Sequence, residues 1–285
     1  MSESHDREII GGHLLVIGGA EDKYNERRIL RKFLELAGGP EKAEVLIVPV
    51  ASDYPEFAAD VYTQAFRNLG VASPRVLRAT SRQDIVNADV DTLLDGVTGI
   101  IMTGGDQMRL VSLFGGTKLA EKIRKMVRET DVVLAGTSAG AAAMSTSMIV
   151  RGEPSSHPHK NAVRLSPGLG FLKNIIIDQH FSERGRISRL ITAVSFNPYN
   201  LGIGIDENTA IILDGHGILE VYGQGSVTVV DGSDITFNQI AEVADNEAFS
   251  VCGIQLHVLR DGLVYDYQER HPLQPPNAFL LPDLG

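Results

Sequence analysis

The strongest constraint on the fold is the alternation of short apolar runs with amphipathic segments through the first two thirds of the chain. Runs typical of buried strands lie at 13–19, 44–52, 75–80, 99–105 and 131–136. Segments with helical periodicity lie between them, at 25–39, 55–70 and 117–130. This alternation is typical of βαβ units, so we expect an α/β fold whose mostly parallel sheet has helices on both faces.

The pattern changes near residue 200. Residues 201–232 alternate apolar side chains with Asp-Gly and Gly-x-Gly turns, which predicts antiparallel strands at one side of the sheet. Residues 254–268 predict a final hairpin around Asp261 and Gly262.

The whole chain is expected to be one domain. Its 285 residues exceed the usual domain size, but α/β sheets of this length often remain a single unit. A hydrophobic content of 43% is enough to bury a sizeable core. We expect a flexible N-terminus over residues 1–10 and a proline-rich tail over 272–285.

Charge and cysteine content exclude several classes of protein. A net charge of −10 with no basic run makes nucleic acid an unexpected partner. The single cysteine, Cys252, cannot form an intramolecular disulfide, which fits a reducing compartment. The start is too polar for a secretory signal, and the apolar stretch 132–150 carries too many hydroxyl groups and glycines for a membrane span. We therefore expect a cytoplasmic protein with no membrane partner.

The segment GTSAG, residues 136–140, fits the G-x-S-x-G pattern of a nucleophile elbow. It follows an apolar strand and precedes an alanine-rich helical segment, as that motif requires. Ser138 is the candidate nucleophile, and the amide of Ala139 is the natural oxyanion donor. The alternative is a glycine-rich packing turn in which Ser138 only caps the helix.

A second glycine pair, Gly104 and Gly105, ends another predicted strand. The carboxyl ends of parallel strands meet at one edge of a sheet, where ligands of α/β proteins bind. Gly105 is therefore a candidate for the second oxyanion donor and Gln107 for a substrate contact. A strand-to-helix turn without chemistry is the alternative.

A nucleophilic serine needs a base. His180 is the histidine that directly follows an apolar strand, so it points to the same sheet edge as Ser138. His157 and His159 form a pair that would suit a metal, but they lack carboxylate neighbours, and we expect no metal.

The acid that orients the histidine is Asp206 or Glu207, at the end of a later apolar strand. Side chains alternate along a strand, so only one of the two faces the site, and the strand alone leaves the choice open. Either residue gives the order Ser, His, acid, which differs from the Ser, acid, His order of α/β-hydrolases.

Five motifs in order, VIGGAEDK, TGGDQ, GTSAGAAAMS, IDQHFSERGR and GIGIDENTA, resemble the cyanophycinase family of serine peptidases, which belongs to the superfamily of peptidase E. The resemblance implies a flavodoxin-like α/β sandwich related to class I glutamine amidotransferases. Those amidotransferases carry a cysteine at the elbow, where this chain has Ser138.

The resemblance also assigns site residues. It implies Ser138 as nucleophile, His180 as base and Glu207, rather than Asp206, as the third member of the triad. The implied substrate pocket comprises Gln107, Asp178, Gln179, Arg184, Arg186 and Arg189. The arginines lie on a predicted helix, where a solvated face is the alternative interpretation.

The implied activity is that of an exopeptidase without a cofactor. Family members hydrolyse cyanophycin, a polyaspartate with arginine on each β-carboxyl group, to β-Asp-Arg dipeptides through an acyl-enzyme, and the resemblance suggests a homodimer. The alternative is a dipeptidase like peptidase E that cleaves α-Asp-X, against which the arginine-bearing segment 182–190 argues. A catalytically silent binding protein fits poorly with a complete set of nucleophile, base and acid.

Overall fold

A computed structural model describes residues 11–152 and 155–273. The predicted flexible N-terminus, 1–10, and residues 274–285 of the predicted tail lie outside the described residues. Pro272 and Leu273, where that tail was expected to start, belong instead to a short edge strand.

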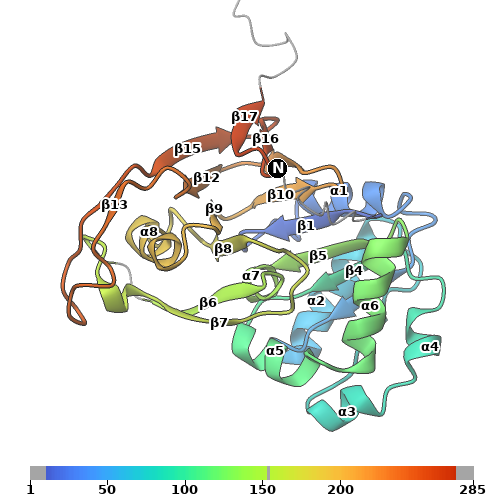
Figure 1. The fold of residues 1–285 in the computed structure, drawn as a ribbon. Helices are drawn as coiled ribbons and strands as arrows, with labels where there is room; N and C mark the ends of the chain where they lie inside the picture. Colours follow the sequence, from blue (N-terminus) through green and yellow to red (C-terminus); the bar gives the residue numbers. More distant parts are fainter. Residues whose placement is uncertain (1–10, 153–154, 274–285) are drawn as a thin grey trace, which may run out of the picture.

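A nine-stranded sheet forms the centre of the molecule (Figure 1). In spatial order its strands are β17 (His271–Leu273), β16 (Val264–Asp266), β11 (Ile218–Gly223), β10 (Thr209–Leu213), β1 (Leu14–Ile17), β5 (Val133–Thr137), β4 (Gly99–Met102), β2 (Val45–Val48) and β3 (Arg75–Val76). The strands from β1 to β3 are parallel, and those from β10 to β17 are antiparallel. The expected α/β class, with antiparallel strands near the C-terminus, is confirmed.

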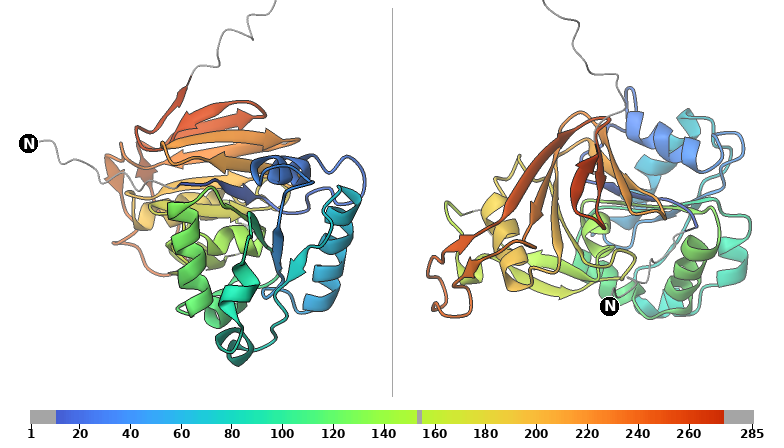
Figure 2. Two further views of the ribbon diagram at one scale, coloured as in Figure 1. Left: turned by 90° about the vertical axis from the view of Figure 1, so that its right-hand side faces the viewer. Right: turned by 45° about the horizontal axis from the view of Figure 1, so that its top comes forward.

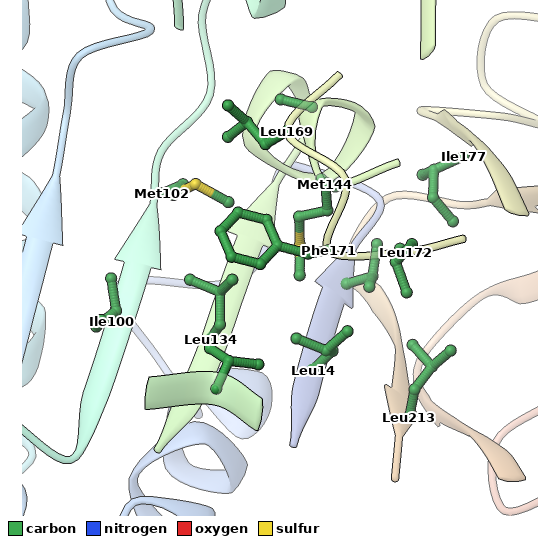
Figure 3. Packing of buried hydrophobic residues seen from close by; sticks show 14 of the residues in the cluster. Leu14, Ile100, Met102, Leu134, Met144, Leu169, Phe171, Leu172, Ile177 and Leu213 are labelled. Atoms are coloured by element: carbon green, nitrogen blue, oxygen red, sulfur yellow. The ribbon is translucent and has the colours of Figure 1, made fainter. Parts of the chain in front are cut away.

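Helices cover both faces of the parallel strands. On one face lie α1 (Arg28–Leu36) and α2 (Pro55–Asn68). On the other face lie α3 (Arg82–Val86), α4 (Val90–Leu94), α5 (Gln107–Phe114), α6 (Lys118–Glu129) and α7 (Ala139–Ala143). Figure 3 shows Leu134, Met144 and Phe171 packed together over the central strands. All-apolar strands such as β1 and β2 are buried on both faces, as a doubly covered sheet requires.

A second sheet packs against the antiparallel part of the first. Its strands, in spatial order, are β15 (Gln255–Arg260), β12 (Ser226–Asp231), β9 (Leu201–Ile205) and β8 (Ile175–Gln179). Its inner side chains join the core cluster of β10 and β11, whereas Ile176 and Val230 face α8 (Ile187–Phe196). Figure 2 shows the C-terminal strands, in orange and red, gathered on the side away from the green helices.

Two short ribbons and a 3-10 helix, η1 (Lys160–Ala162), complete the described secondary structure. The ribbons pair β6 (Ser147–Arg151) with β7 (Arg164–Pro167), and β13 (Phe237–Asn238) with β14 (Val251–Cys252). The apolar stretch 132–150 is thus divided among β5, α7 and β6. Within the described part of the chain, no helix combines the length and the apolar character needed to cross a bilayer.

The predicted hairpin at Asp261 and Gly262 is wrong. The turn is present, but β15 pairs with β12 in the second sheet, whereas β16 pairs with β11 in the first. The Asp261 carboxylate accepts hydrogen bonds from the amide of Gly223, at 3.0 Å, and from Arg28, at 2.7 Å. The two strands therefore diverge from the turn, because β15 belongs to the second sheet and β16 to the first.

Candidate active site

Ser138 lies on the sharp turn between β5 and α7, with φ 52° and ψ −113°. This conformation is unfavourable for a residue with a side chain and persists only where the surroundings enforce it. A Cβ atom on Gly136 would lie 2.6 Å from the carbonyl oxygen of Gly140, and one on Gly140 would lie 2.4 Å from that of Met102. Both flanking glycines are therefore required by close backbone packing.

The Ser138 hydroxyl does not cap α7, so the turn-residue alternative does not describe its contacts. Its Oγ lies 2.9 Å from Nε2 of His180, and Nδ1 of His180 lies 2.6 Å from Oε1 of Glu207. With Nδ1 protonated toward the carboxylate, Nε2 is free to accept the serine proton. The three side chains form a continuous hydrogen-bonded chain, which is the arrangement expected of a nucleophile, its base and an acid.

Asp206, the alternative acid, points away from the histidine. Its carboxylate accepts hydrogen bonds from the amides of Ser182, at 3.0 Å, and Ser226, at 2.9 Å, and from the Ser226 hydroxyl. Burial raises the pKa of Asp206, but these hydrogen bonds outweigh it and hold the pKa below its ordinary value. Strand alternation thus directs Asp206 into the structure and Glu207 to the site.

The backbone at the end of β1 binds the three segments that carry Ser138, His180 and Glu207. The carbonyl groups of Ile17, Gly18 and Gly19 accept hydrogen bonds from the amides of Ser138 (3.0 Å), His180 (2.8 Å) and Asn208 (2.9 Å), respectively. A Cβ atom on Gly19 would lie 2.4 Å from the His180 ring. We call Ile17–Gly18–Gly19 the carbonyl ladder.

The glycine pair after β4 also lies at this edge. A Cβ atom on Gly104 would be 3.3 Å from the Cβ atom of Ser138. Gly105 has φ 141°, and a side chain there would meet the Ala51 carbonyl. Ala139 is the first residue of α7, so its amide precedes the first intrahelical hydrogen bond. The structure thus brings Gly104 directly against the serine.

The residues predicted to form the substrate pocket fall into two groups. Asp178 and Arg189 are only 1% and 5% exposed, and Arg189 Nε donates to Asp178 Oδ2 at 2.7 Å. Arg186, also buried, donates to the carbonyl and side-chain oxygens of Gln179. We call Asp178, Gln179, Arg186 and Arg189 the buried arginine cluster.

The charged groups of the buried arginine cluster pair with one another, although two guanidinium groups share the single carboxylate of Asp178. Arg189 also donates to the Gly152 carbonyl at 2.7 Å, and both arginines form ion pairs with Asp178. Burial lowers the pKa of Arg186 to about 10, against the opposing effect of Asp178. These arginines do not lie on a solvated helix face, which was the alternative interpretation.

The other two predicted pocket residues are more accessible. Gln107 is half-buried at the start of α5 and donates to the Ile149 carbonyl at 2.8 Å. Arg184 is exposed on the segment between His180 and α8, where it forms no ion pair with another described residue.

His157 and His159 have no third metal-ligating side chain beside them among the described residues. His157 and His159 lie with ring centroids 6.1 Å apart, and Nδ1 of His157 is 3.0 Å from the Ser156 hydroxyl. Within residues 11–152 and 155–273, no three His, Cys, Asp or Glu side chains gather as metal ligands would.

One buried acid near the site was missed by the sequence interpretation. Glu21 follows the carbonyl ladder, is 2% exposed, and accepts a hydrogen bond from Thr137 Oγ1 at 2.7 Å. Its position just after a strand, in VIGGAEDK, places it at the same sheet edge as Ser138, and that signal was available in the sequence.

Comparison with known proteins identifies relatives over most of the chain. Residues 14–221 match the model of peptidase family S51. The cyanophycinase of Synechococcus elongatus is 40% identical over 274 residues, which cover 96% of this chain and 84% of that protein. The cyanophycinase of Geminocystis herdmanii is 38% identical over 267 residues, 94% of this chain and 98% of that protein.

A solved structure shares the fold. The crystal structure of a peptidase from an acI-B1 Actinobacterium superposes with a TM-score of 0.68 at 21% identity, and the match covers 92% of this chain and 98% of that one. The arrangement of sheets and helices described above is therefore that of a known peptidase structure.

Proposed function

The chain belongs to peptidase family S51 and is a serine-type peptidase, and on that premise we propose that it hydrolyses cyanophycin to β-Asp-Arg dipeptides. The observation that carries the proposal is the hydrogen-bonded chain from Ser138 through His180 to Glu207. The names of the relatives supply the substrate.

In the proposed mechanism, Ser138 attacks the backbone amide of the polymer while His180 accepts the hydroxyl proton. The negative charge of Glu207 stabilises the imidazolium that forms. His180 then returns the proton to the leaving amine, and the same base activates the water that hydrolyses the acyl-enzyme. The 2.9 Å and 2.6 Å contacts are suited to both proton transfers.

The amides of Gly105 and Ala139 are the proposed oxyanion donors. Two observations support this: Gly104, the residue before Gly105, lies against Ser138, and Ala139 directly follows the serine. Each such donor contributes about 3 kcal/mol to transition-state stabilisation in related chemistry.

We propose two different roles for the predicted pocket residues. Arg184 and Gln107, which are the more accessible, contact the polymer, with Arg184 pairing with a substrate carboxylate. The buried arginine cluster supports the pocket from inside the protein without contacting the polymer, since its ionic groups already bind one another.

The direct test is to incubate the purified protein with insoluble cyanophycin and, separately, with α-Asp-Leu, and to identify soluble products by mass. Release of β-Asp-Arg from the polymer alone supports the proposal. Cleavage of α-Asp-Leu alone would establish instead the second candidate, a dipeptidase of the peptidase E kind. The related chains at about 40% identity favour the polymer.

We further propose that the protein acts in the cytoplasm as a homodimer. Its only cysteine, Cys252, is exposed and unpaired, which suits a reducing compartment. Light scattering coupled to gel filtration measures the mass, and a monomeric mass at micromolar concentration would refute the dimer.

A further inference from the structure

Glu21 is a buried carboxylate that the proposed mechanism does not use. It accepts hydrogen bonds from Thr137 Oγ1, at 2.7 Å, and from the hydroxyl of Tyr62, and it forms an ion pair with Lys23 at 3.2 Å. A buried carboxylate is tolerated only with such partners, because burial removes its hydration. The cluster is therefore a fixed polar anchor at the edge of the sheet.

The anchor joins two parts of the active site. Thr137 immediately precedes Ser138, and Glu21 lies two residues beyond Gly19, the last residue of the carbonyl ladder. One carboxylate thus ties the end of the strand that carries the serine to the loop that supports His180 through Gly18.

The elbow needs such an anchor. Ser138 has a strained backbone, with φ 52° and ψ −113°, and relaxation of the turn would carry its Oγ atom away from His180. Here we propose that Glu21 is a positioning residue, which holds the serine elbow at hydrogen-bonding distance from His180 by fixing Thr137. This inference rests on the proposed role of Ser138 as nucleophile.

The second donor to Glu21, the Tyr62 hydroxyl, keeps its proton near neutral pH. Burial, followed by the nearby charge of Glu21, raises the pKa of Tyr62 well above its ordinary value. The phenol therefore stays protonated and continues to donate to Glu21, while the Lys23 ammonium balances the charge.

The test is Glu21→Gln, which keeps the shape of the side chain and removes its charge. The amide replaces one acceptor oxygen by a donor, so Thr137 or Tyr62 loses its partner. We expect kcat, and the rate at which an organophosphonate labels Ser138, to fall by about 100-fold, the effect of a misplacement near 1 Å, with KM unchanged within twofold. Glu26→Gln, an exposed acid in the same loop, is the matched control and should label at the wild-type rate.

A second pair of variants separates positioning from stability. Thr137→Ser keeps the hydroxyl donor and should label at close to the wild-type rate, whereas Thr137→Val keeps the shape without the donor and should label as slowly as Glu21→Gln. This pair tests the proposal even if Glu21→Gln does not fold. The labelling assay needs no peptide substrate, so it is independent of which polymer the enzyme cleaves.

The outcomes are distinct. Slow labelling in Glu21→Gln and Thr137→Val, with rescue in Thr137→Ser, supports the positioning role. Labelling of folded Glu21→Gln or Thr137→Val at the wild-type rate overturns it while leaving the proposed function intact. If the wild-type protein is labelled no faster than Ser138→Ala, both the proposed nucleophile and this inference fail.

Discussion

The proposed triad and the buried arginine cluster are both networks of charged and polar side chains, and they meet at the peptide bond between Gln179 and His180. The triad is partly accessible to solvent, whereas the cluster is buried. His180 begins the triad side, where Ser138 and Glu207 remain partly accessible. Gln179 begins the cluster side, where Asp178 is 1% exposed and forms ion pairs with two buried arginines. The triad is thus open to a substrate, whereas the cluster is engaged with buried groups of the protein itself.

This contrast predicts that changes on the triad side alter the rate and changes on the cluster side alter stability. The largest expected effect is that of Ser138→Ala. Loss of the nucleophile should lower kcat by roughly 10⁶-fold. The free energy of unfolding should change by less than about 1 kcal/mol, because the hydroxyl is not a helix cap. Polymer hydrolysis and urea unfolding measure the two quantities, and substantial residual turnover would remove Ser138 from the mechanism.

Glu207→Gln is expected to have the next largest effect. An amide in place of the carboxylate no longer stabilises the imidazolium and favours the wrong tautomer of His180, which lowers kcat by about 10⁴-fold in comparable triads. Asp206→Asn serves as the comparison, because that carboxylate does not contact the histidine. Equal losses of rate in the two variants would contradict the assignment of Glu207.

Asp178→Asn tests the other side of the contrast. Removal of this charge leaves Arg186 and Arg189 buried without their counter-ion, so the free energy of unfolding should fall by about 3–5 kcal/mol. Arg184→Ala, on the exposed segment, should leave stability unchanged. Equilibrium unfolding in urea measures both, and an undiminished stability of Asp178→Asn would show that the cluster is not structural.

The smallest effect is the pH dependence contributed by Asp206. Its pKa is lower in the folded chain than the ordinary value of 3.8, so the carboxylate stabilises the folded state above that value. The stabilisation is lost as the pH falls below 3.8 and through the folded-state pKa. Asp206→Asn should therefore be less stable than wild type at pH 7, by about 1–3 kcal/mol for its unpaired donors, with a smaller difference in acid. Thermal unfolding of both proteins at pH 7 and in acid measures the difference in stability.

Local patterns were sufficient to predict much of the architecture and the positions of Ser138 and His180. The alternation of apolar and amphipathic segments indicated parallel strands, and both residues do follow strands. The expected single sheet edge is wrong, however, because β5 lies in the nine-stranded sheet and β8 in the second sheet. The choice between Asp206 and Glu207 needed the resemblance to a family, since neighbouring residues on a strand differ only in the face they occupy.

Long-range pairing was beyond the reach of such patterns. The Asp261–Gly262 turn has the sequence of a hairpin, but whether its strands pair depends on competing partners at β11 and β12. The ion pairs of Arg186 and Arg189 with Asp178 were likewise not predicted, because the sequence does not show which charged side chains meet.

The carbonyl ladder also has a consequence for the order of folding. Ile17, Gly18 and Gly19 come from near one end of the described chain, but they fix the amides of Ser138, His180 and Asn208. Contacts so distant in sequence form only after slow loop closure, because the entropy of closure is lost before the contacts form. An unfinished chain therefore carries its serine in a turn without an aligned base. A peptidase built in this way gains its hydrolytic activity only with its complete tertiary structure.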